Sequence, residues 1–146
     1  LNYIGDSIMV VFGAPQKLKD HENQAVNCAL KMKKLLGELN SQWDENKLSR
    51  YWKNHGINAI TMRTGIHTGS VIAGNIGSPE MLQYSTIGDT VNVASRIEQA
   101  NKEFNTEISF SHEIYTALEE KLFGKSKLSG EITLKGRTKP TKVYSI

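Results

Sequence analysis

The sequence predicts an α/β or α+β domain in which helices cover one mixed β-sheet. Short runs rich in β-branched and aromatic residues, typical of strands, alternate with longer segments whose apolar residues recur every three or four positions, as in amphipathic helices. Hairpin signals join some of the strands, which favours a mixed sheet over a purely parallel one. The 146 residues are enough to enclose a hydrophobic core, so we expect a single domain over residues 1–146.

The first two strands are expected at Leu1–Ile4 and Ile8–Phe12, on either side of a Gly-Asp-Ser sequence. A Gly-Asp pair between two such runs indicates a tight β-hairpin, which places Asp6 at its tip. The chain therefore begins inside a hairpin, an unusual place for a domain boundary, and we expect the domain to lack an N-terminal strand and helix.

The first helix is expected from Asp20 or His21 to about Asn40, because five apolar residues follow helical spacing. These residues are Ala25, Ala29, Met32, Leu36 and Leu39. The polar segment 41–56 is predicted to be either a helical extension or an ordered surface loop. Its aromatic side chains favour packing against another surface, such as that of a second subunit; they are Trp43, Tyr51 and Trp52.

The middle of the chain is predicted to hold three strands. Ala59–His67 and Val71–Ile76 are expected to flank a turn at residues 68–70, so that the second strand returns along the first. Tyr84–Ile87 forms the third strand, and Gly88 ends it.

A helix is predicted directly after this third strand, from a cap at Asp89 or Thr90 to about Glu103. Its apolar face consists of Val93, Ile97, Ala100 and Phe104. Asn92 and Arg96 are four residues apart and share a different face. An amide and a guanidinium fork pointing together suit a polyanionic or ring-oxygen ligand, although the pair by itself is also common on polar surfaces.

The C-terminal part is predicted to contain a strand at Glu107–Phe110, a helix from His112 to about Lys121, and two strands within Leu128–Ile146. From residue 121 onward the chain has seven basic residues and one acidic residue, although the net charge of the whole sequence is only +3. Such a basic end either meets phosphate groups or forms a solvated, lysine-rich surface.

Several classes of site are excluded by the sequence. The lone Cys28 rules out an internal disulfide and a cysteine-rich metal site, and it favours a cytoplasmic setting. No apolar run approaches the roughly 18 residues of a membrane span, so we expect no membrane contact from this segment. Tethering of the protein to a membrane through segments upstream of this one stays open. Gly69 and Gly74 have Walker A spacing, but Asn75 stands where the lysine is required. The basic end lacks interleaved aromatic residues, so we expect no nucleic acid partner.

Four segments, taken together, resemble the class III nucleotidyl cyclase catalytic domain, most closely that of bacterial adenylate cyclases. They are Tyr3–Pro15, Arg63–Gly69 (Arg-Thr-Gly-Ile-His-Thr-Gly), Ile87–Arg96 (Ile-Gly-Asp-Thr-Val-Asn-Val-Ala-Ser-Arg) and Leu134–Gly136. Each segment alone is a weak signal, but the set is highly specific because it follows the family's order and spans nearly the whole chain.

The resemblance implies an α+β, ferredoxin-like fold that works as a head-to-tail homodimer with active sites at the subunit interface. The implied reaction is attack of the ribose 3′-hydroxyl of ATP on its α-phosphorus, which gives 3′,5′-cyclic AMP and pyrophosphate. Two Mg²⁺ or Mn²⁺ ions are the implied cofactors, and such hard ions prefer carboxylate oxygens.

The resemblance also implies roles for individual residues. Asp6 matches the family's second metal-binding aspartate. Arg96 matches the arginine that stabilises charge on the reacting phosphate, and Asn92 matches the asparagine that orients the ribose. Lys135 matches the lysine that holds the terminal phosphates, which gives the basic end a role.

The sequence departs from the family pattern at three places. The first metal-binding aspartate, which lies upstream in the family, has no counterpart in residues 1–146, so we expect the chain as given to be nearly inactive. Asn2 stands where adenylate cyclases carry a lysine for the adenine ring, and Ser85 where they carry Asp or Thr. Guanylate cyclases typically have Glu and Cys at these two positions.

The leading hypothesis is an adenylate cyclase domain with Asn92 and Arg96 as catalytic residues, Asn2, Ser85 and Lys135 as substrate-binding residues, and Asp6 as a metal ligand. Two alternatives follow from the departures. The domain could be a non-catalytic cyclase homology module used for dimerisation or nucleotide sensing, or it could be a guanylate cyclase.

Overall fold

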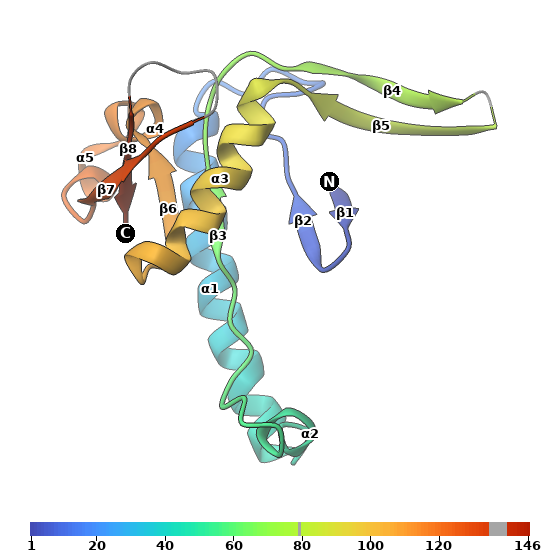
Figure 1. Cartoon of the computed structure of the whole chain (residues 1–146), viewed down its shortest axis with the longest axis vertical. Coiled ribbons are helices and arrows are strands. Elements are labelled where there is room, and N and C mark those ends of the chain that lie inside the picture. The colour runs from blue at the N-terminus through green and yellow to red at the C-terminus, as the bar shows by residue number, and fades with distance from the viewer. Residues whose placement is uncertain (79, 135–139) are drawn as a thin grey trace.

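The computed structural model describes residues 1–78, 80–134 and 140–146. Its body is a four-stranded mixed sheet with helices on both faces, from which two β-hairpins and the far end of a long helix project (Figure 1). The expected combination of a mixed sheet with covering helices is therefore confirmed, with the two hairpins standing outside the main sheet.

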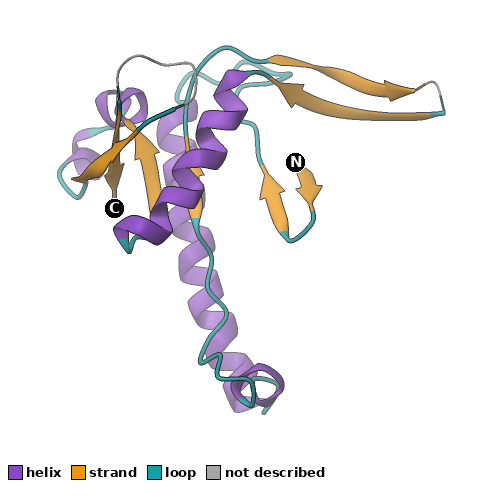
Figure 2. Ribbon diagram, viewed as in Figure 1, coloured by secondary structure: helices purple, strands orange, loops and turns teal. Residues whose placement is uncertain are grey.

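The strand order in the main sheet is β3-β6-β8-β7. Strand β3 (Thr64–Ile66) runs parallel to β6 (Ile108–Ser111), whereas β8 (Thr141–Ser145) is antiparallel to both β6 and β7 (Lys127–Ile132). The separate hairpins are β1 (Asn2–Ile4) with β2 (Ser7–Met9), and β4 (Ile72–Ser78) with β5 (Met81–Ile87). The β4–β5 hairpin forms a long arm that extends away from the body (Figure 2).

Five helices accompany these strands in the described part of the chain. They are α1 (His21–Glu45), α2 (Arg50–Lys53), α3 (Asp89–Phe104), α4 (His112–Ala117) and α5 (Glu120–Phe123). Helices α1, α4 and α5 contribute to one hydrophobic cluster and α3 to another, and the main sheet lies between the two clusters.

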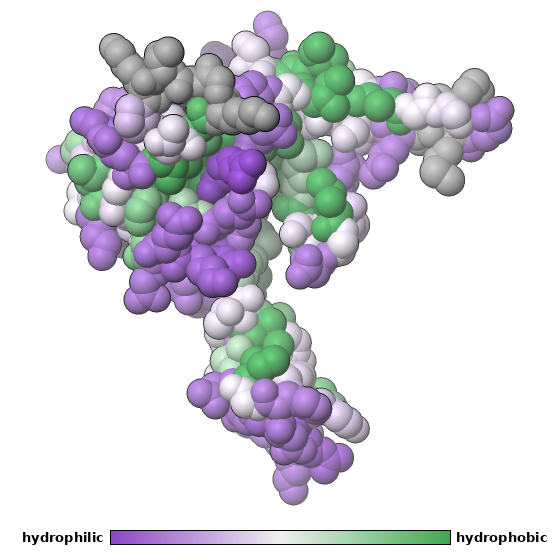
Figure 3. All heavy atoms as spheres, in the orientation of Figure 1, coloured by the Kyte–Doolittle hydropathy of each residue, from purple (hydrophilic) through white to green (hydrophobic). Residues whose placement is uncertain are grey.

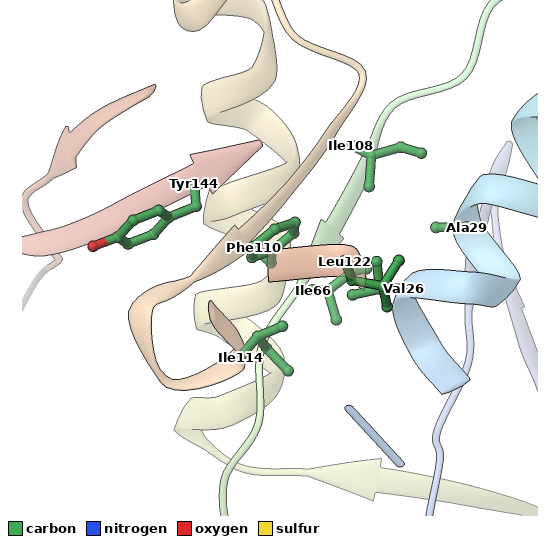
Figure 4. Close-up of a cluster of buried hydrophobic side chains, with 8 residues drawn as sticks. All are labelled: Val26, Ala29, Ile66, Ile108, Phe110, Ile114, Leu122 and Tyr144. Atoms are coloured by element: carbon green, nitrogen blue, oxygen red, sulfur yellow. The ribbon is translucent and has the colours of Figure 1, made fainter. Parts of the chain in front are cut away.

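The larger cluster joins α1, α4 and α5 to one face of the sheet. Its members are Val26, Ala29, Ile66, Ile108, Phe110, Ile114, Leu122 and Tyr144 (Figure 4). The smaller cluster, which includes Val93 and Ile97 of α3, contains Val143. Because Val143 and Tyr144 are neighbours on one strand, their side chains point to opposite faces, which explains why they belong to different clusters.

The strands near the middle of the chain differ from the sequence expectation. The predicted strand Ala59–His67 is reduced to the three residues of β3, and β4 does not return along it. Instead, β4 pairs with β5 over seven residues, from Ile72 opposite Ile87 to Ser78 opposite Met81. The sequence shows that each run favours an extended backbone, but the choice of partner depends on contacts between residues far apart in the chain.

The helices differ in three respects. Helix α1 extends to Glu45 rather than Asn40, and α4 ends at Ala117, where the single helix predicted to reach Lys121 is interrupted. The residue that precedes the first turn of α3 is Gly88, with φ of 149°, rather than Asp89 or Thr90. A φ of this size strains residues with a side chain, so glycine suits the sharp change of direction between β5 and α3.

Residues 41–45 of the segment 41–56 extend α1, as one of the two expectations stated, and the rest of the segment consists of turns and the short helix α2. Its two tryptophans pack on each other, since the rings of Trp43 and Trp52 meet edge to face with centroids 5.4 Å apart, whereas Tyr51 is exposed. The side chain of Asn40 exchanges two hydrogen bonds of 2.9 Å with the backbone of Ile60, which ties the returning chain to α1.

A buried polar network fixes the C-terminal end of α3 to the sheet. The side chain of Asn101, only 1% exposed, donates from Nδ2 to the carbonyl oxygen of Thr64 at 3.0 Å. Its Oδ1 accepts hydrogen bonds of 2.8 Å from the hydroxyls of Thr106 and Ser109. The amide thus links α3, β3 and β6, and both Asn101 and Ser109 are buried.

Replacing Asn101 by alanine is expected to lower the free energy of unfolding by about 2–3 kcal/mol, because it leaves buried polar groups without their partner. Urea denaturation followed by circular dichroism measures this change. The control is Asn27→Ala, an exposed position on α1, which should leave stability unchanged or slightly higher. A loss below about 1 kcal/mol for the Asn101 variant would show that the network contributes little.

The projecting parts of the molecule carry exposed apolar side chains. Figure 3 shows hydrophobic surface on the β1–β2 hairpin and near the base of the β4–β5 arm. Tyr3 is 71% exposed on the first hairpin and Ile72 is 70% exposed on the second. Among the described helices, none is both long enough and apolar enough to cross a membrane.

Candidate functional site

Two hairpins that are far apart in the sequence meet through polar side chains. Asn2 on β1 donates from Nδ2 to the hydroxyl of Ser85 on β5 at 3.2 Å. Gln83, two residues before Ser85 on the same strand, donates from Nε2 to Oδ1 of Asn2 at 3.1 Å. The structure therefore brings together the two residues expected to contact the purine, and it adds Gln83 as a third member.

Gln83 did not emerge from the sequence analysis. A signal for it exists, because residues two apart on a strand point to the same face, so a site that includes Ser85 has Gln83 beside it. We refer to Asn2, Gln83 and Ser85 as the amide cluster. All three side chains are uncharged, and each can both donate and accept hydrogen bonds.

The helix that bears Asn92 and Arg96 follows β5 after a single residue, Gly88. Val93 and Ile97 of α3 are buried, whereas Asn92 and Arg96 are exposed, as the apolar periodicity predicts. Arg96 donates from Nη1 to the side-chain oxygen of Gln99 at 3.3 Å, one turn further along the helix. Its guanidinium is therefore accessible to a ligand outside the helix.

Asp6 is exposed in the turn of the β1–β2 hairpin, as the sequence predicts. The turn lies at the end of the hairpin away from Asn2, because Ile4 pairs with Ser7 next to the turn and Asn2 pairs with Met9 at the other end. The structure thus separates Asp6 from the amide cluster within one chain. This separation is compatible with sites formed between two subunits.

The residues that the structure describes do not by themselves form a metal centre. In the described part of the chain, no three side chains of His, Cys, Asp or Glu gather closely enough to hold a metal ion. Asp6 offers one carboxylate, and hard divalent ions take several oxygen ligands, so further ligands are needed.

The remaining expected substrate-binding residue, Lys135, lies outside the described residues. The residue before it, Leu134, is buried in the cluster that also contains Val93 and Ile97 of α3.

His67 has a structural position in the fold. Its side chain is 4% exposed, and its Nδ1 lies 2.8 Å from the hydroxyl of Ser111.

The arrangement suits a ligand with a planar polar edge and a negatively charged group. Amide and hydroxyl groups recognise the hydrogen-bonding edge of a heterocyclic base. A guanidinium binds phosphate through two parallel hydrogen bonds, and Arg96 supplies one on the helix that continues from the strand bearing Ser85. A nucleotide combines both features.

Comparison with known proteins shows the family to which the chain belongs. The family model described as "Adenylate and Guanylate cyclase catalytic domain" matches residues 1–146. The chain is 32% identical to Adenylate cyclase 1 of Rhizobium meliloti over its whole length, which is 20% of that protein. Its structure is similar to that of the guanylyl cyclase Cya2, with a TM-score of 0.75 and 30% identity over 99% of this chain and 66% of the other. For the adenylyl cyclase CyaB from P. aeruginosa, the TM-score is 0.70 with 29% identity over 99% of this chain and 68% of the other. With a family match over every residue and a shared fold, the chain belongs to the adenylate and guanylate cyclase catalytic domain family.

Proposed function

We propose that this domain is part of an adenylate cyclase that converts ATP into 3′,5′-cyclic AMP and pyrophosphate. The observation that carries the proposal is the amide cluster, which joins β1 to β5 beside the helix that bears Asn92 and Arg96. The purine would lie against the cluster and the triphosphate toward Arg96. Lys135 would hold the terminal phosphates.

In the reaction, the 3′-oxygen of the ribose forms a bond to the α-phosphorus, and the bond from that phosphorus to the bridging oxygen of pyrophosphate breaks. The proton of the 3′-hydroxyl is released, and the electron pair of the broken bond leaves with pyrophosphate. The side chain of Asn92 orients the ribose. The guanidinium of Arg96 stabilises the negative charge that develops on the phosphoryl oxygens.

The preference for ATP rests on the charge of the amide cluster, because the similar proteins include both adenylate and guanylate cyclases. Guanine presents two neighbouring N–H donors, N1–H and the exocyclic amine, which a carboxylate accepts best. Adenine presents an amine and a ring acceptor, which neutral amides and hydroxyls satisfy. Asn2, Gln83 and Ser85 are all neutral, which favours adenine.

We also propose that Asp6 provides one carboxylate to Mg²⁺ or Mn²⁺ and that an upstream aspartate, outside residues 1–146, provides another. A homodimer would bring Asp6 of one subunit toward the amide cluster of the other. The exposed apolar residues of the two projecting hairpins support such an interface.

The test is a cyclase assay on the full-length protein that contains this domain, with ATP or GTP and with Mg²⁺ or Mn²⁺. Cyclic AMP as the main product is the expected result. Cyclic GMP alone would make the domain a guanylate cyclase, and the absence of any product from a folded dimer would favour a non-catalytic module.

A substitution in the amide cluster tests how the base is recognised. Replacing Asn2 by glutamate is expected to raise the ratio of kcat/KM for GTP over ATP by about 10-fold or more, because a carboxylate accepts the paired donors of guanine. Competition assays with both nucleotides measure the ratio. Asn2→Gln keeps the amide and should leave the ratio within about 3-fold, whereas an unchanged ratio in the glutamate variant would exclude Asn2 from the base site.

A further inference from the structure

Helix α3 is attached at both of its ends to residues 64–70, which include β3 and the turn after it. At the first turn, the hydroxyl of Thr90 donates to the carbonyl oxygen of Ser70 at 2.8 Å. At the last turn, Asn101 donates to the carbonyl oxygen of Thr64 at 3.0 Å. The two attachments lie two residues before Asn92 and five residues after Arg96, so they bracket both functional side chains.

Between these attachments, α3 lies directly on the backbone of β3 at Gly65. A Cβ atom at Gly65 would lie 2.8 Å from Cα of Glu98 and still closer to the backbone nitrogen of Glu98 and the carbonyl oxygen of Ala94. These are backbone atoms of a regular helix, so no side-chain rotation could relieve the overlap. Any side chain at position 65 would therefore push α3 away from β3.

The residues that α3 presents to Gly65 flank Arg96. Ala94 and Glu98 lie two residues before and two residues after it, while Arg96 itself points outward. On the exposed side, Nε of Arg63 lies 2.9 Å from Oε1 of Glu98. Together with the hydrogen bond to Thr64 and the close approach at Gly65, this contact means that three consecutive residues, 63–65, touch the same helix. This set of contacts fixes both the distance of α3 from the sheet and its rotation about its axis.

We propose that Gly65 is a positioning residue for turnover: its lack of a side chain sets the depth at which α3 lies and thereby the place where Arg96 meets the nucleotide. The inference rests on the proposed cyclase function. A displacement of about 1 Å in a catalytic group can cost up to about 100-fold in rate, and the overlap at Gly65 requires a shift of this order.

The experiment places Gly65→Ala in the full-length protein, both in the wild-type background and in the Arg96→Ala background. In the wild type, kcat per folded molecule is expected to fall about 30- to 100-fold while KM for ATP changes less than about 3-fold. In the Arg96→Ala background, the loss of kcat from the same substitution should be at least about 5-fold smaller than in the wild type, because only Asn92 is then left on α3 to be displaced. Circular dichroism and thermal unfolding give the folded fraction of each variant.

The matched control is Gly37→Ala on α1, where an added Cβ meets no atom within 4 Å. This control should leave kcat unchanged in both backgrounds. An equal loss from Gly65→Ala in the two backgrounds, or no loss in the wild type, would overturn the positioning role while leaving the cyclase function intact.

Thr90→Val serves as a second variant if Gly65→Ala does not fold. Valine has nearly the shape of threonine but removes the 2.8 Å bond to Ser70, which loosens the first turn of α3. We expect kcat to fall about 5- to 10-fold in the wild type and by a smaller factor in the Arg96→Ala background, where only Asn92 remains to be displaced. If the wild-type protein makes no cyclic nucleotide, the proposed function is wrong and the positioning role with it. If the wild type is active but Gly65→Ala causes an equal loss in both backgrounds, only the positioning role is wrong.

Discussion

Replacing Arg96 by alanine is expected to lower kcat for cyclic AMP formation by about 100- to 1,000-fold in the full-length protein. The side chain is exposed on α3, and its described hydrogen bond is a 3.3 Å contact to Gln99, so its loss removes little from the fold. The charge that it would stabilise develops mainly in the transition state, so the change should appear in kcat more than in KM. Product formation is measured by chromatography of the cyclic nucleotide at saturating ATP.

Two further variants make this experiment specific. Lys102→Ala removes another exposed cation from the same helix and should leave kcat within about 2-fold, because only general electrostatic attraction is lost. Arg96→Lys keeps the charge but loses the planar fork, so an intermediate loss is expected. If Arg96→Ala retained more than half of the wild-type kcat, the role proposed for Arg96 would be wrong.

Replacing Phe110 by alanine is expected to lower the free energy of unfolding by about 3–5 kcal/mol. Phe110 is fully buried on β6, a central strand with β3 on one side and β8 on the other, and its ring lies among the side chains of the larger cluster (Figure 4). The substitution removes a large apolar surface and leaves a cavity that the surrounding strands cannot close. Equilibrium denaturation in urea measures the change, which is a large part of the stability of an ordinary domain.

The control for Phe110 is Leu128→Ala on β7, where the leucine is 55% exposed. This variant should lose less than about 1 kcal/mol, because little of its surface leaves water on folding. The Phe110 variant should retain the wild-type kcat per folded molecule at low temperature. Equal losses of stability in the two variants would contradict the position of Phe110 in the core.

Elements with local signals could be predicted from the sequence. The apolar spacing of Val93, Ile97 and Ala100 predicted α3 almost to the residue, and it placed Asn92 and Arg96 on the exposed face. The Gly-Asp pair likewise predicted the β1–β2 hairpin with Asp6 in its turn. Helical periodicity and turn chemistry depend on residues within a few positions of each other, so one sequence is enough to read them.

The segments that meet across long stretches of chain could not be predicted and are seen in the folded structure. It paired β4 with β5 instead of β3, added Gln83 to Asn2 and Ser85, and placed the backbone of Gly65 against α3. It also showed that Trp43 and Trp52 pack on each other, which the composition of their segment left open. Strand partners and close backbone approaches are set by packing between residues tens of positions apart, and a propensity at one position carries no information about the partner.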